Sequence, residues 1–246
     1  MLCCDLNCDL GEGTGNDAAI MPFITSANIA CGFHAGDETT MRETIALAKQ
    51  YNVAIGAHPS FLDRENFGRT EMSCTPEEVN ELVVDQIKIL QKIAADYNMR
   101  LHHVKPHGAL YNMAAQDKAL AKAVAAAVKL CGADLILYGL SGSHLIKEAA
   151  AIGLKTANEV FADRTYQDNG SLTPRTQPNA LIEDEAQAIH QVLRMIKGKK
   201  VITVSQKYRP IFADTVCIHS DGKQAVSFAQ KIHHTLQQHH IVLQTV

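Results

Sequence analysis

Several features that mark particular protein classes are missing from this chain of 246 residues. No apolar stretch approaches the roughly 20 residues that a membrane-spanning helix needs, so we expect no contact with a membrane interior. The first residues lack a basic segment followed by a long apolar core, so we expect no signal peptide. The net charge of −3 is spread without a long basic or acidic block, which argues against a nucleic-acid or anionic-membrane partner.

Two kinds of short motif are also missing. None of the seven cysteines forms a C-x-x-C pair, and their odd number favours buried, reduced thiols over a disulfide framework. We therefore expect a cytoplasmic protein. The glycine-rich segment 11–16 does not match G-x-G-x-x-G, and G-x-x-x-x-G-K-[ST] is absent, so the chain has no recognisable phosphate-binding loop.

What the chain does contain is an alternation of strand-like and helix-like segments. The strand-like runs are at residues 3–8, 26–31, 53–57, 102–105, 134–138, 154–160, 200–204 and 214–218, and the helix-like segments are at 38–51, 76–97, 116–131, 143–152, 183–196 and 222–236. This alternation favours parallel strands with right-handed crossovers. It predicts one α/β domain, 1–246, built as an incomplete or distorted TIM-like (β/α) barrel of about seven strands. A doubly wound open sheet is the alternative.

Most of the predicted strands end in a cluster of ionisable residues and glycines. The first cluster follows residues 3–9, and the others are at 28–37, 58–69, 105–112, 138–143, 159–166 and 219–222. In parallel α/β folds the loops that follow the strands converge on one face of the molecule, and that face carries the chemistry. The clusters therefore predict one shared site.

Three polar residues alternate along the first predicted strand. Asp5, Asn7 and Asp9 point to the same side, which in a barrel is the interior. Inward polar side chains are costly unless they are hydrogen-bonded or used in function. Asp9 is nearest the mouth and is the strongest candidate, with a satisfied polar layer as the alternative. For Glu12, in the following loop, function and structure are equally good explanations.

A histidine or a lysine follows each of the next three strands. His58 and Lys105 both precede a proline, which favours extended geometry and fixes them at strand ends. A lysine there could stabilise a developing oxyanion. His34 has no obvious structural role, whereas Asp37 is better explained as a helix N-cap than as a catalytic group.

Two charged loops follow later strands. In the loop 63–69, Arg64 or Arg69 could bind a substrate carboxylate or phosphate, although ion pairs within a solvated loop explain the charges equally well. Acidic and basic residues also end the sixth strand, and a long segment, 162–180, follows them. Loops of that length are often lids over an active site.

Six of these segments together resemble the LamB/YcsF family. The resemblance extends from Asp5 to about Gly222 without a clear departure at the ionisable positions, and its motifs are long and ordered. They are segments 5–13, 26–37, 56–61, 63–69, 104–112 and 159–166.

The resemblance implies an A subunit of the bacterial ATP-dependent 5-oxoprolinase. Such an enzyme opens 5-oxoproline, a lactam, to L-glutamate with ATP as co-substrate, together with partner subunits B and C. The resemblance also implies the fold of the glycoside hydrolase/deacetylase group. In that group an aspartate and histidines commonly bind a divalent metal, and the positional analogues here are Asp9, His34 and His58.

A lactam is a poor electrophile, so phosphorylation of its carbonyl oxygen would activate it. Because this chain has no phosphate loop, we expect the partners to perform that step and this chain to open the product. The expected catalytic residues are Asp9 or Glu159 to activate water, Lys105 to stabilise negative charge, and His58 or His107 to protonate the leaving nitrogen. The expected substrate-binding residues are Asn7, Asn28, His34, Arg64, Arg69, Asp163, Arg164 and His219.

Two other hypotheses remain open on the sequence alone. A self-sufficient, metal-dependent amidohydrolase or deacetylase would act without ATP or partners. A non-catalytic binding subunit would tolerate loss of the ionisable residues at the strand ends.

Overall fold

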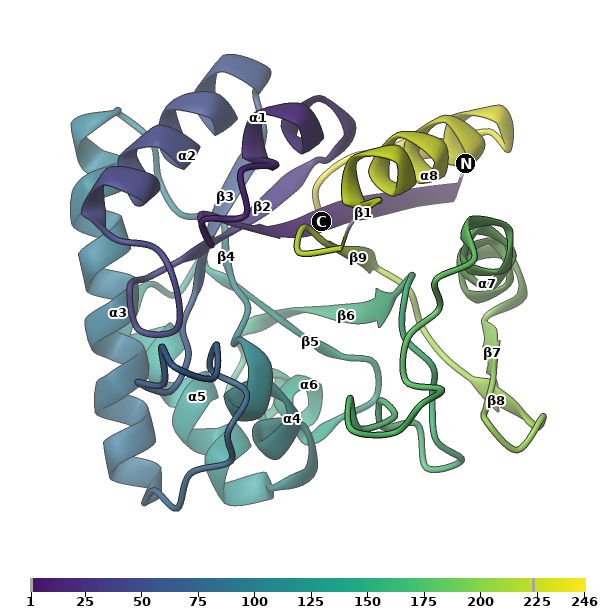
Figure 1. Ribbon diagram of the computed structural model, residues 1–246. Coiled ribbons are helices and arrows are strands. Elements are labelled where there is room, and N and C mark those ends of the chain that lie inside the picture. The colour runs from purple at the N-terminus through teal and green to yellow at the C-terminus, as the bar shows by residue number, and fades with distance from the viewer. Residues whose placement is uncertain (1, 223) are drawn as a thin grey trace.

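The computed structural model describes residues 2–222 and 224–246 and shows a closed ring of parallel strands surrounded by helices (Figure 1). The ring strands follow the order β1-β2-β3-β4-β5-β6-β9, and β9 pairs with both β6 and β1, which closes the ring. The predicted TIM-like barrel of about seven strands is confirmed, and the open doubly wound sheet is wrong. The ring strands are β1 (Leu2–Leu10), β2 (Ser26–Ala30), β3 (Ala54–His58), β4 (His103–Val104), β5 (Ile136–Leu140), β6 (Lys155–Phe161) and β9 (Thr215–His219).

Helices cover the outside of the ring and connect most of its strands (Figure 1). Within the described part of the chain, no helix is both long and apolar enough to cross a membrane. The helical elements are α1 (Asp17–Ile20), the 3₁₀ turn η1 (Met21–Phe23), α2 (Glu38–Tyr51), α3 (Pro76–Asp96), α4 (Gly108–Gln116), α5 (Lys118–Cys131), α6 (His144–Ala151), α7 (Glu185–Gly198) and α8 (Ala225–Gln238).

The starts of α2 and α3 follow from their sequences. The Thr75 side chain accepts from the backbone N–H of Glu78 while the Glu78 side chain accepts from that of Thr75, and Pro76 takes the first helical position. Asp37 caps α2 through the backbone N–H of Thr40, so its interpretation as an N-cap is confirmed. These caps fix where each helix begins relative to the strand before it.

The sequence pattern did not predict the place of two elements, the strand expected at 200–204 and helix α4, whereas the last strand lies within segment 239–246, where the sequence predicts a short strand. The strand expected at 200–204 is β7 (Lys200–Ile202), and it pairs antiparallel with β8 (Tyr208–Pro210) outside the ring. Since β9 already joins β6 to β1, the ring has no gap for another strand. The C-terminal strand β10 (Ile241–Leu243) pairs with the start of β1. Helix α4 has no counterpart among the predicted helices.

A buried polar layer occupies the interior of the ring below the strand ends. The Asp5 carboxylate accepts hydrogen bonds from three hydroxyl groups, those of Thr25, Ser26 and Thr215. Nearer the mouth, Asn28 donates to both Asn7 and Asp9. The inward direction of the β1 polar residues is thus confirmed. Asp5 belongs to a satisfied polar layer, whereas Asp9 lies where that layer meets the mouth.

One glycine makes this interior packing feasible. A Cβ atom on Gly56 of β3 would lie 2.3 Å from Cδ2 and Nε2 of His103. The His103 ring cannot easily move, since it donates to Asn28 Oδ1 at 2.7 Å and stacks on Tyr138 with ring centroids 4.2 Å apart.

We therefore predict that Gly56→Ala lowers the free energy of unfolding by about 1–3 kcal/mol, the usual cost of overpacking. Gly198→Ala is the control, because its Cβ would have no contact shorter than 3.7 Å. Urea unfolding of both variants measures the difference. Equal stability of the two variants would contradict the tight packing of His103 on β3.

Candidate active site

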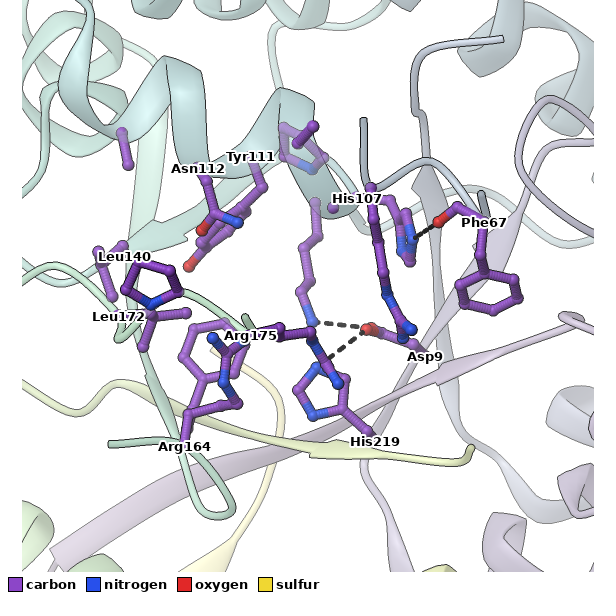
Figure 2. Close-up of a pocket in the computed structure, with 18 of the residues that line it drawn as sticks. Asp9, Phe67, His107, Tyr111, Asn112, Leu140, Arg164, Leu172, Arg175 and His219 are labelled. Carbon is purple, nitrogen blue, oxygen red and sulfur yellow. Dashed lines mark hydrogen bonds and ion pairs between the residues drawn. The ribbon is translucent and has the colours of Figure 1, made fainter. Parts of the chain in front are cut away.

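The mouth of the barrel holds a pocket of about 550 Å³ at the carboxyl ends of the strands (Figure 2). Its walls come from β1, β3, β6 and β9, from the start of α4, and from the long loop after β6. The predicted convergence of the strand-end clusters on one face is therefore observed. Residues that line the pocket include Asp9, His58, Lys105, His107, Arg164 and His219.

A buried lysine stands at the floor of this pocket. Lys105 Nζ lies 2.7 Å from Asp9 Oδ1, 3.0 Å from Glu159 Oε1 and 3.0 Å from Cys217 Sγ. Burial alone would lower the pKa of Lys105, but the negative charge of Asp9, together with the nearby Cys217 and Glu159, outweighs it and raises the pKa well above its ordinary value. The ammonium group is therefore charged, and its position is fixed from several sides.

Asp9 is the acidic partner of this lysine. Its Oδ1 also accepts from Asn28 Nδ2 at 2.8 Å, and its Oδ2 lies 3.4 Å from His58 Nε2. Burial would raise the pKa of Asp9, but the nearby charges of His58 and Lys105 hold it well below its ordinary value. Asp9 is thus an ionised carboxylate with one oxygen committed to Lys105 and the other directed at the histidines.

Two histidines, His58 and His107, face each other through ring nitrogens that are both hydrogen-bond acceptors in the neutral rings. His58 Nδ1 is 2.7 Å from the Lys105 carbonyl oxygen, and His107 Nε2 is 2.9 Å from the Phe67 carbonyl oxygen, so each of these nitrogens must carry a hydrogen. The remaining nitrogens, His58 Nε2 and His107 Nδ1, are 2.8 Å apart. In two neutral rings both would present lone pairs, so this contact requires a proton or another cation between them.

Glu12 and His34 complete the polar wall next to this pair. Ser60 donates its hydroxyl hydrogen to the Phe61 carbonyl, so it accepts from His34 Nδ1, which leaves a lone pair on His34 Nε2. Glu12 Oε1 lies 3.2 Å from that nitrogen. Burial and the charge of Asp9 raise the pKa of Glu12 well above its usual range. Burial and the charge of His58 lower the pKa of His34 to about 2. Both observations fit a protonated Glu12 that donates to a neutral His34.

The structure brings most, but not all, of the predicted site residues to the pocket. Glu159 is fully buried behind Lys105 and does not line the cavity. Asn7 lies beneath it and donates to Glu159 Oε1 at 3.1 Å. Arg64 is exposed and donates to the carbonyl oxygens of Gly32 and Gly36, outside the pocket lining. Arg64 thus holds the loop after β2, and these contacts are not ion pairs within the 63–69 loop.

Four further predicted residues, His219, Asp163, Arg164 and Arg69, lie around the mouth of the barrel. His219 Nδ1 is 2.7 Å from Asp163 Oδ2, and its Nε2 is 4.0 Å from Asp9 Oδ2. Arg164 is buried and donates to the carbonyl oxygens of Thr173 and Ala180. Arg69, at the mouth, pairs with Asp221 at 2.7 Å.

Sequence reasoning missed several residues at the site. Tyr111, on α4, and Arg175, in the long loop, line the pocket (Figure 2). Cys217 is the sulfur partner of Lys105. Tyr111 lies in the segment 104–112. Because no helix was predicted there, the sequence did not show that the Tyr111 side chain faces the pocket. No pattern in the loop 162–180 distinguishes Arg175 from its neighbours.

Comparison with known proteins assigns the family. The model of the LamB/YcsF family matches residues 4–246. The chain belongs to the LamB/YcsF family. It is 54% identical over 245 residues to a protein of Bordetella parapertussis named as the A subunit of 5-oxoprolinase, and the match covers 98% of this chain and 97% of that protein. The protein of the same name from Shouchella clausii is 56% identical, with 97% and 96% of the two chains covered.

Solved structures agree with this LamB/YcsF assignment. The crystal structure of a lactam utilization protein from Thermus thermophilus superposes with a TM-score of 0.92 and 39% identity, and the match covers 100% of both chains. The peptidoglycan deacetylase PdaC from Bacillus subtilis superposes with a TM-score of 0.51 and 12% identity, covering 100% of this chain and 88% of that one. The second likeness shows a shared fold and nothing more, and it agrees with the deacetylase-like barrel that the sequence predicted.

The ion pair between Lys105 and Asp9 predicts a pH-dependent effect on stability. Because the pKa of native Asp9 lies below its ordinary value of 3.8, its ionised form stabilises the fold above about pH 4. This contribution is lost as the pH falls through the lowered pKa. Lys105→Met removes the nearest cation, so the buried Asp9 carboxylate becomes costly and its pKa rises.

We predict that Lys105→Met lowers the free energy of unfolding by about 3–5 kcal/mol at pH 7. The difference from the wild type shrinks as the pH falls toward about 4, because protonation of Asp9 removes the unpaired charge. Lys118→Met, which removes an exposed pair with Glu148 at 3.8 Å, changes stability by less than about 1 kcal/mol. Denaturant unfolding at several pH values measures this, and a pH-independent difference would contradict the assignment.

Proposed function

We propose that this chain is the A subunit of an ATP-dependent 5-oxoprolinase and hydrolyses an activated form of 5-oxoproline to L-glutamate. Two relatives that match nearly its whole length are named as the A subunit of 5-oxoprolinase. The observation that carries the chemistry is the pocket floor, where a buried ammonium, a carboxylate and paired histidines meet. Such a site can move protons and stabilise negative charge in a water-poor setting.

In this mechanism His58 activates the water molecule, and Asp9 assists it. The depressed pKa of Asp9 makes it a weak base, so its carboxylate is better suited to stabilise an imidazolium 3.4 Å away. His58 is held by the Lys105 carbonyl with its Nε2 lone pair toward the pocket wall that Asp9 shares. In this role the histidine pair, when it lacks its shared proton, takes up a proton from the attacking water at His58 Nε2.

The same histidine pair returns a proton to the leaving nitrogen. His107 Nδ1 lies 2.8 Å from His58 Nε2, so a proton accepted by one ring is shared with the other. As the C–N bond of the phosphorylated lactam breaks, His107 protonates the ring nitrogen to form the amine, and a second water then hydrolyses the resulting acyl phosphate to glutamate and phosphate. Lys105, 2.7 Å from Asp9, stabilises the negative charge that develops on the attacked centre.

Residues outside the proton path hold the substrate and the lysine. Glu159 positions Lys105 from behind, because it contacts Nζ at 3.0 Å without reaching the cavity. Asn28 holds Asp9 Oδ1, and Asn7 holds Glu159. Arg69 at the mouth offers a guanidinium to the substrate carboxylate.

The partners supply the activated substrate in this proposal. We assign ATP-dependent phosphorylation of the lactam to subunits B and C, because no phosphate-binding motif occurs in this sequence. Cys4, Cys8, Cys31, Cys74, Cys131 and Cys217 are free thiols, which fits a protein of the cytoplasm. The loop 162–180, whose residues 171–176 line the pocket, would close over the bound lactam.

One observation favours a metal-dependent amidohydrolase as a second candidate. The facing nitrogens of His58 and His107 lie in a group with Glu12 and His34 whose ligand atoms are within 4.8 Å of one another. This donor set suits a divalent cation. Asp9 lies in a different group, with Cys217 and His219, so the structure does not gather the triad Asp9, His34 and His58 that the fold analogy suggested. A bound cation would act as a Lewis acid toward the lactam carbonyl.

We predict that Asp9→Asn reduces glutamate formation by the reconstituted complex by about 10²- to 10⁴-fold, because the imidazolium loses its counter-charge. The matched control is Asp85→Asn, an exposed aspartate on α3, which leaves glutamate formation unchanged. Chromatographic measurement of glutamate with B and C present in excess gives the rates. Wild-type rates in Asp9→Asn would refute the catalytic assignment of this pocket.

A metal measurement separates the two candidates. If a resident cation bridges His58 and His107, protein dialysed after exposure to Zn²⁺ or Mn²⁺ retains one equivalent, and His107→Gln retains much less. Elemental analysis gives the stoichiometry. The proton-sharing mechanism instead predicts less than about a tenth of an equivalent in both proteins and full activity of the complex after chelation of tightly bound metal.

A further inference from the structure

We propose that Arg164 and Arg175 form the binding site for a phosphoryl group, which places the phosphate of the activated substrate against the wall next to His219. The inference rests on the proposed function and specifies which form of the substrate the pocket accepts. Both arginines line the cavity, and Figure 2 shows them on the same side of it as His219.

The argument begins with the balance of charge around the pocket. The ammonium of Lys105 is matched by Asp9 and Glu159, and Arg69 is matched by Asp221. Among the described residues, no carboxylate oxygen lies within ion-pair distance of Arg164 or Arg175. Neither guanidinium group is therefore paired directly with a described carboxylate, and the only acidic side chain whose charge is seen to act on Arg164 is its chain neighbour Asp163.

The surroundings of the two arginines suit an anionic ligand. Arg164 is buried, and its hydrogen bonds go to the neutral carbonyls of Thr173 and Ala180. Burial and the charge of Arg175 lower the pKa of Arg164 to about 10, as expected for cations that lack an anion. The charge of Asp163, the residue before Arg164, offsets part of this effect, but its Oδ2 is engaged by His219 at 2.7 Å. An anionic ligand would relieve both the burial and the mutual repulsion.

A phosphoryl group fits this site better than the substrate carboxylate does. Two guanidinium groups match the two negative charges of a phosphate, and their planar donors bind its oxygens in pairs. A carboxylate with one charge would leave half of the positive charge unmatched. The pocket of about 550 Å³ also has room for more than a five-membered ring, since such volumes are typical of sites for drug-sized ligands.

The position relative to Asp9 supports the same conclusion. His219 connects the two regions, because its Nδ1 contacts Asp163 and its Nε2 lies 4.0 Å from Asp9 Oδ2. A phosphoryl group held by the arginines would thus place the lactam carbon, to which it is linked through its bridging oxygen, beside the proposed catalytic groups. Arg175 belongs to the loop after β6, so the same contact would hold that loop over the occupied pocket.

The test is titration calorimetry of the isolated chain with inorganic phosphate and, separately, with 5-oxoproline. Arg175 has no hydrogen bond within the described chain and is half-buried, so Arg175→Gln should fold normally. We expect this variant to raise the dissociation constant for phosphate at least tenfold and that for 5-oxoproline less than twofold. Arg175→Lys, which keeps the charge, should lose less than Arg175→Gln. Arg194→Gln, a half-buried arginine of α7, is the matched control and should bind phosphate normally.

The possible results test the phosphoryl site and the proposed function independently. No phosphate binding by the wild type, or equal binding by Arg175→Gln, would overturn the phosphoryl site. A tenfold loss for 5-oxoproline alone would also overturn it, since the arginines would then bind the carboxylate. If phosphate binding depends on Arg175 but the reconstituted complex makes no glutamate, the site stands and the 5-oxoprolinase proposal fails.

Discussion

The arrangement of this site depends on one requirement, which is that a lysine buried at the mouth of the barrel must be surrounded by anions. Lys105 meets this requirement through Asp9 and Glu159, which reach it from β1 and β6. Those carboxylates are in turn held by Asn28 and Asn7 inside the ring. Closure of the ring by β9 brings β1 and β6 close enough for both contacts. The fold and the chemistry therefore share one hydrogen-bonded network.

Two groups at the pocket lack a partner of opposite charge within this network, and these groups determine which ligands the pocket can bind. The paired nitrogens of His58 and His107 need a cation between them, which a mobile proton satisfies. Among the described residues, no carboxylate lies within ion-pair distance of Arg164 or Arg175, so this pair can accept an anion from a ligand. A site that can take up a proton at one wall and an anion at the other suits a phosphorylated lactam, whose conversion to glutamate and phosphate consumes two water molecules.

Sequence alone predicted the barrel and most of the pocket, because hydrophobic periodicity and strand-end clusters are local signals. It placed Asp9, His58 and Lys105 at one face, and the structure brings them together. It could not predict that Glu159 would lie behind Lys105, because depth along a strand depends on strand tilt and register. Nor could it identify Arg175, since a loop of irregular conformation leaves no periodic pattern. The strand 200–204 was misplaced because a strand-like run does not specify its partner.

The central claim is that the partner proteins activate the lactam and this chain opens it. The most direct measurement follows 5-oxoproline-dependent ATP hydrolysis and glutamate formation in the same samples, with subunits B and C alone and with this chain added. The account predicts that B and C alone turn over ATP without forming glutamate, and that addition of this chain couples the two. Glutamate formation by B and C alone would contradict it.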